Sequence, residues 1–96
     1  MSDYKFGVLE FNILGDTPIF FKMSDALIEK ISKLPKEELA KANDDSWKLK
    51  RQSERLMKKY SNVTQHGHRP YDEAYFSYLV ATAIMRETWK HMRKGD

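Results

Sequence analysis

The fold of this chain depends most on one uncharged stretch, residues 74–85, with the sequence AYFSYLVATAIM. This stretch is the longest run without a charged side chain, and its 12 residues are too few to cross a bilayer. Its apolar side chains point in every direction on a helical wheel: Ala74, Ala81 and Met85 cover one side, Phe76, Val80, Ala83 and Ile84 a second, and Tyr75, Tyr78, Leu79 and Trp89 a third. This pattern is typical of a buried helix, so we expect the segment at the centre of the domain.

The helix that contains this stretch is predicted to span Asp72–Arg93, about 33 Å at a rise of 1.5 Å per residue. A chain of 96 residues has little other material with which to cover it. Either a second copy packs against residues 74–89 and forms a homodimer, or the N-terminal hairpin covers the remaining side in a monomer. Exclusion of water from apolar side chains drives both arrangements.

Further helices are predicted upstream. Ser24 and Asp25 are suitable N-caps for an amphipathic helix, and Pro35 ends that helix and favours the first turn of the next one. The apolar positions of the first of these helices follow the helical spacing: Leu27, Ile28, Ile31 and Leu34. Residues 43–46, NDDS, either interrupt the second helix or cap it again, and Trp47–Tyr60 is predicted to be helical. A polar loop is expected over Ser61–Pro70.

The N-terminal residues are predicted to form a β-hairpin. Residues 4–14 are expected to be one strand, whose apolar positions change face between Val8 and Leu9; this indicates a strand buried on both faces or a bulge at Gly7. Residues 15–18, GDTP, have turn chemistry, and Ile19, Phe20 and Phe21 are expected to return as the second strand. An isolated hairpin is marginally stable, so this one must pack on the helices.

The predicted fold class is therefore α+β, an N-terminal β-hairpin packed on three to four α-helices with the long apolar C-terminal helix central. One domain is expected over 1–96, with the hairpin in 1–23 and helices in 24–96. Hydrophobic residues make up 41% and charged residues 32% of the chain, which is typical of a globular protein. Asp3 and Lys5 precede any apolar stretch, which does not resemble a secretory signal, so we expect a cytoplasmic protein.

Basic residues are concentrated in the second half of the chain. Residues 1–47 hold 6 basic and 9 acidic side chains, whereas residues 48–96 hold 11 basic and 5 acidic ones. One stripe on the second helix and a weaker one on the last helix are the candidate partner-binding residues: Lys48, Arg51, Arg55, Lys58, Lys59, Arg86, Lys90 and Arg93. Such stripes bind acidic side chains or phosphates, although a solvated helix face also carries such charges.

Catalytic and metal-binding patterns are weak. The chain has no cysteine, which excludes disulfides, thiolate metal sites and cysteine nucleophiles. His66 and His68, near Asp72 and Glu73, lack a third ligand at a known metal spacing, so no metal and no cofactor is expected. The paired carboxylates Asp44 and Asp45, with Glu37 and Glu38 upstream, are interpreted as caps and surface charge.

The function favoured by these observations is a small non-enzymatic binding or regulatory protein, of the adaptor or inhibitor type that phages and mobile elements also encode. Its basic helical face would dock onto an acidic macromolecule, with a protein as the favoured partner because Tyr, Trp and Arg are typical interface anchors. The first alternative is binding to a nucleic-acid backbone. The second alternative is a metal-dependent enzyme that uses the His66 and His68 loop.

Overall fold

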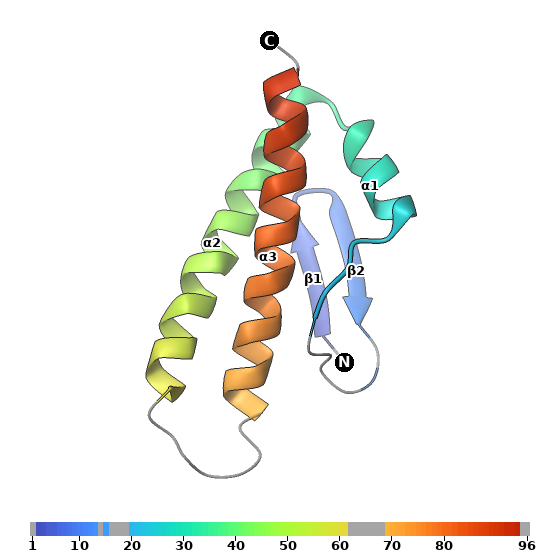
Figure 1. Cartoon of the computed structure of the whole chain (residues 1–96). Coiled ribbons are helices and arrows are strands. Elements are labelled where there is room, and N and C mark those ends of the chain that lie inside the picture. Colours follow the sequence, from blue (N-terminus) through green and yellow to red (C-terminus); the bar gives the residue numbers. More distant parts are fainter. Residues whose placement is uncertain (1, 14, 16–19, 62–68, 95–96) are drawn as a thin grey trace.

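The computed structural model describes residues 2–13, 15, 20–61 and 69–94. Over these residues the chain is an α+β protein with one two-stranded antiparallel sheet and three helices (Figure 1). The elements in chain order are β1 (Ser2–Phe6), β2 (Leu9–Ile13), α1 (Asp25–Ser32), α2 (Lys36–Tyr60) and α3 (Arg69–Lys94). The α+β class is therefore confirmed. No helix in the described part of the chain is both long and apolar enough to span a membrane.

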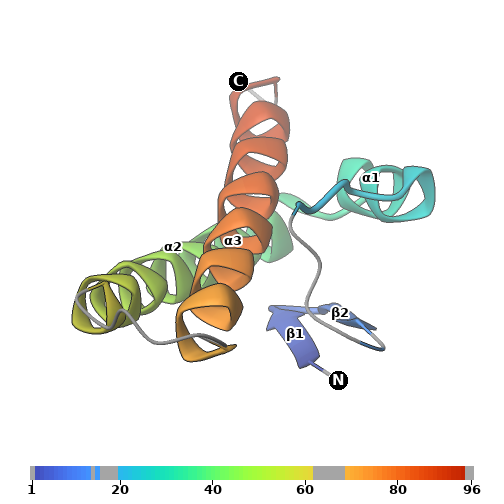
Figure 2. The same cartoon turned by 60° about the horizontal axis from the view of Figure 1, so that its bottom comes forward.

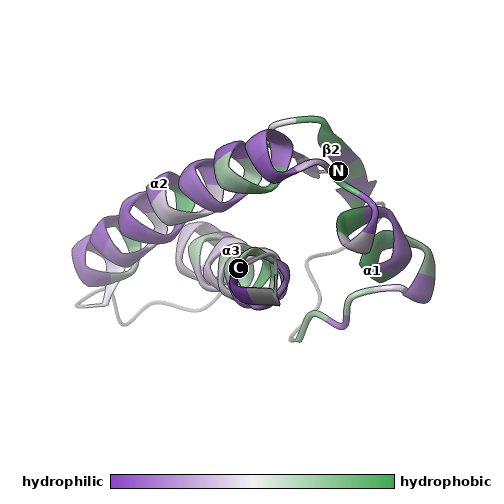
Figure 3. Ribbon diagram, turned by 90° about the horizontal axis from the view of Figure 1, so that it is seen from above, coloured by the Kyte–Doolittle hydropathy of each residue, from purple (hydrophilic) through white to green (hydrophobic). Residues whose placement is uncertain are grey.

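The two long helices form an antiparallel pair (Figures 1 and 2). The hairpin lies against both of them, with its turn beside α2 and Tyr4 beside Phe76 of α3, and α1 lies beside α3. The core fills the space between this pair and the hairpin. Alternate hairpin side chains such as Phe6 and Leu9 point inward and belong to the same buried cluster as Phe76 and Val80 of α3, because side chains on a strand alternate between its faces. In Figure 3, where residues are coloured by hydropathy, the hydrophilic residues of α2 lie along its outer side.

The hairpin turns earlier than predicted. Phe6 pairs directly with Leu9, so Gly7 and Val8 form a two-residue turn, and the prediction of one strand over residues 4–14 is wrong. Gly7 has a φ of +61°, and among the described residues no residue other than glycine has a positive φ. This is the pattern of a type II′ turn, which requires glycine at its first central position. The change of face between Val8 and Leu9 therefore marks the turn itself.

Gly7 also ties the hairpin to α2, because its N–H donates a 2.7 Å hydrogen bond to Asp45 Oδ2. We expect Gly7→Ala to lower the free energy of unfolding by about 1–2 kcal/mol, the cost of a left-handed conformation for a residue with a Cβ. Space is not the limit, since the nearest atom to such a Cβ would be Ala42 N at 3.4 Å. Urea unfolding measures the change. Val8→Ala is the matched control, and equal stability of the two variants would contradict the turn assignment.

The prediction of a second strand at residues 19–21 is wrong for Phe20 and Phe21, because these residues have no regular secondary structure and lead into α1. Ile19 and the predicted turn residues 16–18 lie outside the described residues. The ring centroid of Phe21 lies 5.9 Å from the ring centroid of Phe11 and 5.9 Å from that of Phe76. The apolar run is therefore a connection that closes the core beside β2, because aromatic packing does not require a strand.

The first helix agrees with its sequence signals. Ser24 is the N-cap of α1, and its Oγ accepts a 3.2 Å hydrogen bond from the N–H of Leu27. Ile31 is fully buried, with Leu27 and Leu34 packed against the core. The local cap and the spacing of apolar residues were sufficient to predict this helix.

The second helix is continuous through residues 43–46, so the predicted interruption is wrong. These polar side chains find partners that leave the helical backbone intact. Asn43 Nδ2 donates to Met85 O at 3.2 Å and to Thr88 Oγ1 at 3.1 Å across the pair, and Asp45 accepts from Gly7. Ser46 Oγ donates to Asn43 O at 2.6 Å. The side chains of these residues therefore make contacts within the folded protein and do not form the helix caps that such residue types often form.

The last helix begins at Arg69, within the predicted loop and before the predicted start at Asp72; residues 62–68 of that loop lie outside the described part. The prediction that its apolar stretch is buried on every side is also wrong. Tyr75 is 40% exposed and Trp89 is 54% exposed, whereas Val80 is fully buried. One side of α3 is therefore available to solvent.

Candidate functional site

All eight basic residues predicted to bind a partner are exposed to solvent, but they do not form one face. Asn43 of α2 lies opposite Met85 and Thr88 of α3, so the later residues of α2 lie beside the start of α3. At 1.5 Å per residue, the midpoints of the two basic stripes are about 20 Å apart along the helix axes. A single flat partner surface would have to extend over about 20 Å to contact both basic stripes.

The basic residues of α2 are also divided around that helix. Three of them share one direction and are called the α2 flank here: Lys48, Arg55 and Lys59. At about 100° per residue, the α2 flank shares the direction of Lys41, whose side chain lies against Gly7 of the hairpin turn. Arg51 points about 60° and Lys58 about 80° away from the middle of the α2 flank, toward the side of Trp47. The predicted stripe thus covers an arc of about 100°, which reaches from the side of Lys41 to the side of Trp47.

Exposed aromatic side chains gather on the side of the helix pair that faces away from the hairpin. Phe76 and Val80 point into the core, so the helical repeat directs Tyr75 and Trp89 away from it. Trp89, Trp47 and Tyr75 are three of the five large hydrophobic side chains that are exposed within the described ranges. We call this surface the outer face; it consists of Trp47, Lys50, Arg51, Tyr75, Tyr78, Arg86, Trp89 and Arg93.

Lys50 connects the two helices on the outer face. Its Nζ lies 5.3 Å from the ring centroid of Trp47 and 5.7 Å from that of Tyr78. It also forms a 2.9 Å ion pair with Glu54, and only 19% of its side chain is exposed. The guanidinium of Arg51 lies 5.9 Å from the Trp47 ring. Cation–π contacts therefore hold these side chains in fixed positions in the middle of the outer face.

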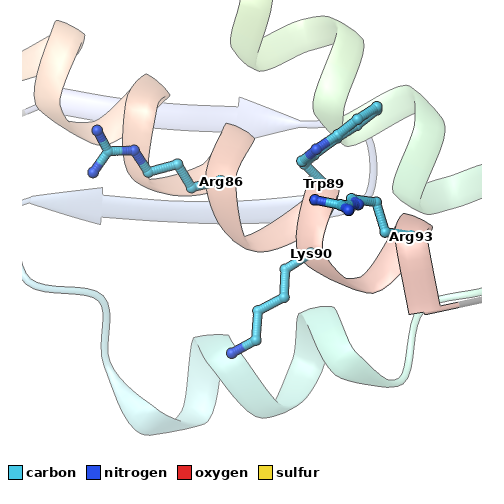
Figure 4. A pocket seen from close by; sticks show the side chains of 4 residues that line it. All are labelled: Arg86, Trp89, Lys90 and Arg93. Atoms are coloured by element: carbon cyan, nitrogen blue, oxygen red, sulfur yellow. The ribbon is translucent and has the colours of Figure 1, made fainter.

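The C-terminal half of α3 carries the most exposed part of this surface. Arg86, Trp89, Lys90 and Arg93 line an open hollow of about 470 Å³ (Figure 4). In Figure 4 Arg86 and Lys90 project from α3 in different directions, and Trp89 and Arg93 lie close to each other on another side of the helix. No acidic side chain lines the hollow. The exposed indole is consequently surrounded by positive charge.

Within the described residues, one of the eight candidate cations is neutralised by an ion pair. Lys48 of the α2 flank pairs with Asp44 at 3.3 Å between Nζ and Oδ2. Over the same residues, Arg86, Lys90 and Arg93 have no ion pair with a carboxylate, and the same holds for Arg55 and Lys59 of the α2 flank. Three uncompensated charges on one short stretch of helix repel one another, and an anionic partner relieves that repulsion.

The predicted metal ligands His66 and His68 lie outside the described residues. His91 pairs with Glu87 at 2.8 Å between Nε2 and Oε2, in a half-buried position on α3. Among the described side chains, no group of three or more metal-ligating residues is present. The acidic residues Asp44 and Asp45 are engaged with Lys48 and Gly7, so they do not form a carboxylate pair directed at one point.

Comparison with known proteins found no matching family model, no similar curated protein and no similar solved structure.

The aromatic members of the outer face were not among the predicted site residues. The periodicity placed Tyr75, Tyr78 and Trp89 on one side of α3, which was interpreted as buried. A signal in the sequence could have shown that these aromatic residues are exposed. Arg86 and Arg93 point in the same direction as Trp89, and arginine is seldom buried in a protein core. Apolar and cationic residues on one stripe indicate a surface that is exposed in the free protein.

Proposed function

We propose that this protein is a small non-enzymatic binding protein, of the adaptor or inhibitor type, which docks its outer face onto an acidic surface of a partner protein. The observation that supports the proposal is Trp89, which is 54% exposed among Arg86, Lys90 and Arg93. An exposed indole surrounded by cations combines the two residue types, Trp and Arg, that dominate binding energy at protein interfaces.

The two parts of this site contribute differently. Burial of the Trp89 ring removes apolar surface from water, which favours a tight complex. The uncompensated guanidinium groups of Arg86 and Arg93 attract carboxylates, which favours fast and selective association. An acidic protein surface satisfies both parts, because it offers carboxylates beside apolar side chains.

Two features of the outer face favour a protein over a nucleic acid. The Trp47 ring is not free for base stacking, because Lys50 and Arg51 of this chain already lie against it. Glu54, half exposed beside Lys50, also places a carboxylate in the path that a phosphate backbone would follow. The remaining cations are separated into the C-terminal part of α3 and the α2 flank, which offers no continuous track for phosphates.

Titration with two polyanions tests the partner class. We expect poly-L-glutamate to change the tryptophan emission of the protein and to bind at least about tenfold more tightly than single-stranded oligothymidylate of equal charge. The reason is that carboxylate side chains on a polypeptide can reach Arg86 and Arg93 while its methylene groups cover Trp89. Added salt should weaken this binding moderately. Tighter binding of the oligonucleotide, with log affinity falling linearly and steeply with log salt, would instead establish a nucleic-acid-binding protein.

A further inference from the structure

We infer that two copies of this protein pair through the exposed side of α3, with the two α3 helices antiparallel and a two-fold axis at Thr82. This inference goes beyond the proposed function, because it concerns the free protein before a partner binds. Three observations support it: the form of the hollow on α3, the order of side chains along α3, and the distance that antiparallel pairing leaves between like charges.

The hollow on the C-terminal half of α3 has the form that receives a side chain of another helix. Within the described residues it is lined by α3 alone, at the spacing i, i+3, i+4, i+7: Arg86, Trp89, Lys90 and Arg93. Four residues at this spacing surround the hole into which a side chain of a facing helix inserts. In Figure 3 no described element lies on the side of α3 that faces away from α2 and the hairpin. A helix of another molecule can therefore reach the hollow.

Tyr75 is the matching side chain of a second copy. It is 40% exposed, and it lies within about 20° of the direction of Arg86 and Arg93 around α3. Residue 82 is the midpoint between residues 75 and 89. A two-fold axis at Thr82 therefore places Tyr75 of each copy against Trp89 of the other. Both rings lose contact with water at both ends of the pair, which favours association.

The same axis brings opposite charges together. Asp72 is exposed in the first turn of α3, and within the described residues it has no ion pair. Residue 72 lies 10 positions before Thr82 and residue 93 lies 11 positions after it, so Asp72 of each copy lies beside Arg93 of the other. Asp72 also points in the same direction around α3 as Lys90. Each basic hollow thus receives a carboxylate as well as an aromatic ring.

Antiparallel pairing keeps the basic side chains of the two copies apart. With the axis at Thr82, the two Arg86 positions are about 12 Å apart along the helices and the two Arg93 positions about 33 Å apart. Charges at a protein surface are largely screened beyond about 8–10 Å at physiological ionic strength. The dipoles of antiparallel helices also attract each other. A parallel pair would instead place each arginine against its own copy.

Small side chains at the axis allow the helices to approach closely. Thr82 and Ala83 occupy the centre of the pair, and Thr82 Oγ1 already donates a 2.8 Å hydrogen bond to Tyr78 O. The hydroxyl group therefore keeps a partner when water is excluded. One side of one helix offers fewer residues than the roughly 20–30 a side of a stable interface. We therefore expect a weak dimer whose population depends on protein concentration.

The pair covers the part of the outer face that the proposed function assigns to a partner. Trp89, Arg86 and Arg93 cannot contact a second copy and an acidic partner protein at the same time. The partner must therefore displace the second copy, and the fraction of free outer face falls as the protein concentration rises. Self-pairing thus limits partner binding at high protein concentration.

Exchange of the two charges tests the antiparallel order. Asp72→Arg brings two arginines together at each end of the pair and Arg93→Asp brings two aspartates together, so each variant should raise the dissociation constant of the dimer at least about tenfold. The double variant restores opposite charges and keeps the net charge of +3. We expect it to dimerise within about threefold of the wild-type protein. Light scattering over a dilution series from about 10 μM to about 1 mM measures each constant.

The matched controls make the same charge changes in the first and last turns of α2, Glu37→Arg and Lys59→Asp. All four positions are exposed, so the variants should fold as the wild-type protein does, which circular dichroism checks. Both controls should dimerise as the wild-type protein does. A monomer mass for the wild-type protein over the whole series would overturn the inference. Unchanged dimerisation of the single α3 variants, or no recovery in the double variant, would overturn the antiparallel order.

Titration with poly-L-glutamate distinguishes this inference from the proposed function. If both hold, the apparent affinity for poly-L-glutamate is lower at protein concentrations that favour the dimer. Binding of poly-L-glutamate by a protein that stays monomeric would overturn this inference and leave the proposed function in place. A dimer that recovers in the double variant but does not bind poly-L-glutamate would overturn the proposed function alone. Binding that does not depend on protein concentration would overturn the competition for one face.

Discussion

Val80→Asp should prevent this domain from folding at room temperature. Val80 lies in the middle of α3, has no solvent exposure and belongs to the core cluster that includes Phe6, Leu9 and Phe76. A carboxylate at this position would be buried without a partner, at a cost of several kcal/mol. Small domains have a free energy of unfolding of about 5–15 kcal/mol, so this single change removes most or all of it.

Thermal melting followed by circular dichroism measures the effect, with Tyr75→Asp as the matched control. The control introduces the same charge into the same helix at a position that is 40% exposed, so its carboxylate remains hydrated. We expect the control to melt within a few degrees of the wild-type protein. Similar melting temperatures for the two variants would show that α3 does not pack on the hairpin as described.

Reversal of charge at the end of α3 should abolish partner binding and leave the fold intact. We expect Arg86→Glu combined with Arg93→Glu to weaken capture of the partner from a nuclease-treated lysate by at least about a hundredfold, because two attractive contacts become repulsive. Both residues are exposed, and exposed substitutions change the free energy of unfolding by about 0.5 kcal/mol or less.

The matched control for this pair reverses two residues of the α2 flank, Arg55→Glu with Lys59→Glu. Both double variants lower the net charge from +3 by four, to −1, so they alter the long-range field equally. Only the first pair changes the outer face. Retained binding by the control and lost binding by the α3 variant would locate the interface. Equal loss in both would show that the net charge matters more than the position, and the opposite order would move the interface to the α2 flank.

The site could be predicted from sequence only in part. The exposure of all eight basic residues followed from their helical spacing, because a stripe of Lys and Arg can hardly be buried. Their grouping did not follow, since it depends on how α2 is rotated relative to the hairpin and on which α2 residues lie beside which α3 residues. Trp47 and Trp89 were overlooked because an aromatic side chain at helical spacing is usually part of a core.

Local signals in the sequence were sufficient for the fold class, for α1 and for the existence of two long helices. The Ser24 cap acts within one turn, and the apolar repeats of residues 74–85 act within one helix, so neither depends on distant residues. Only the tertiary structure decided why α2 continues through residues 43–46 and which side of α3 remains exposed. Each depends on contacts between distant segments: Asp45 with Gly7 and Asn43 with Thr88 in the first case, and the hairpin with one side of α3 in the second. A hairpin of two five-residue strands is too small to surround a long helix, and the side that it leaves uncovered became the outer face.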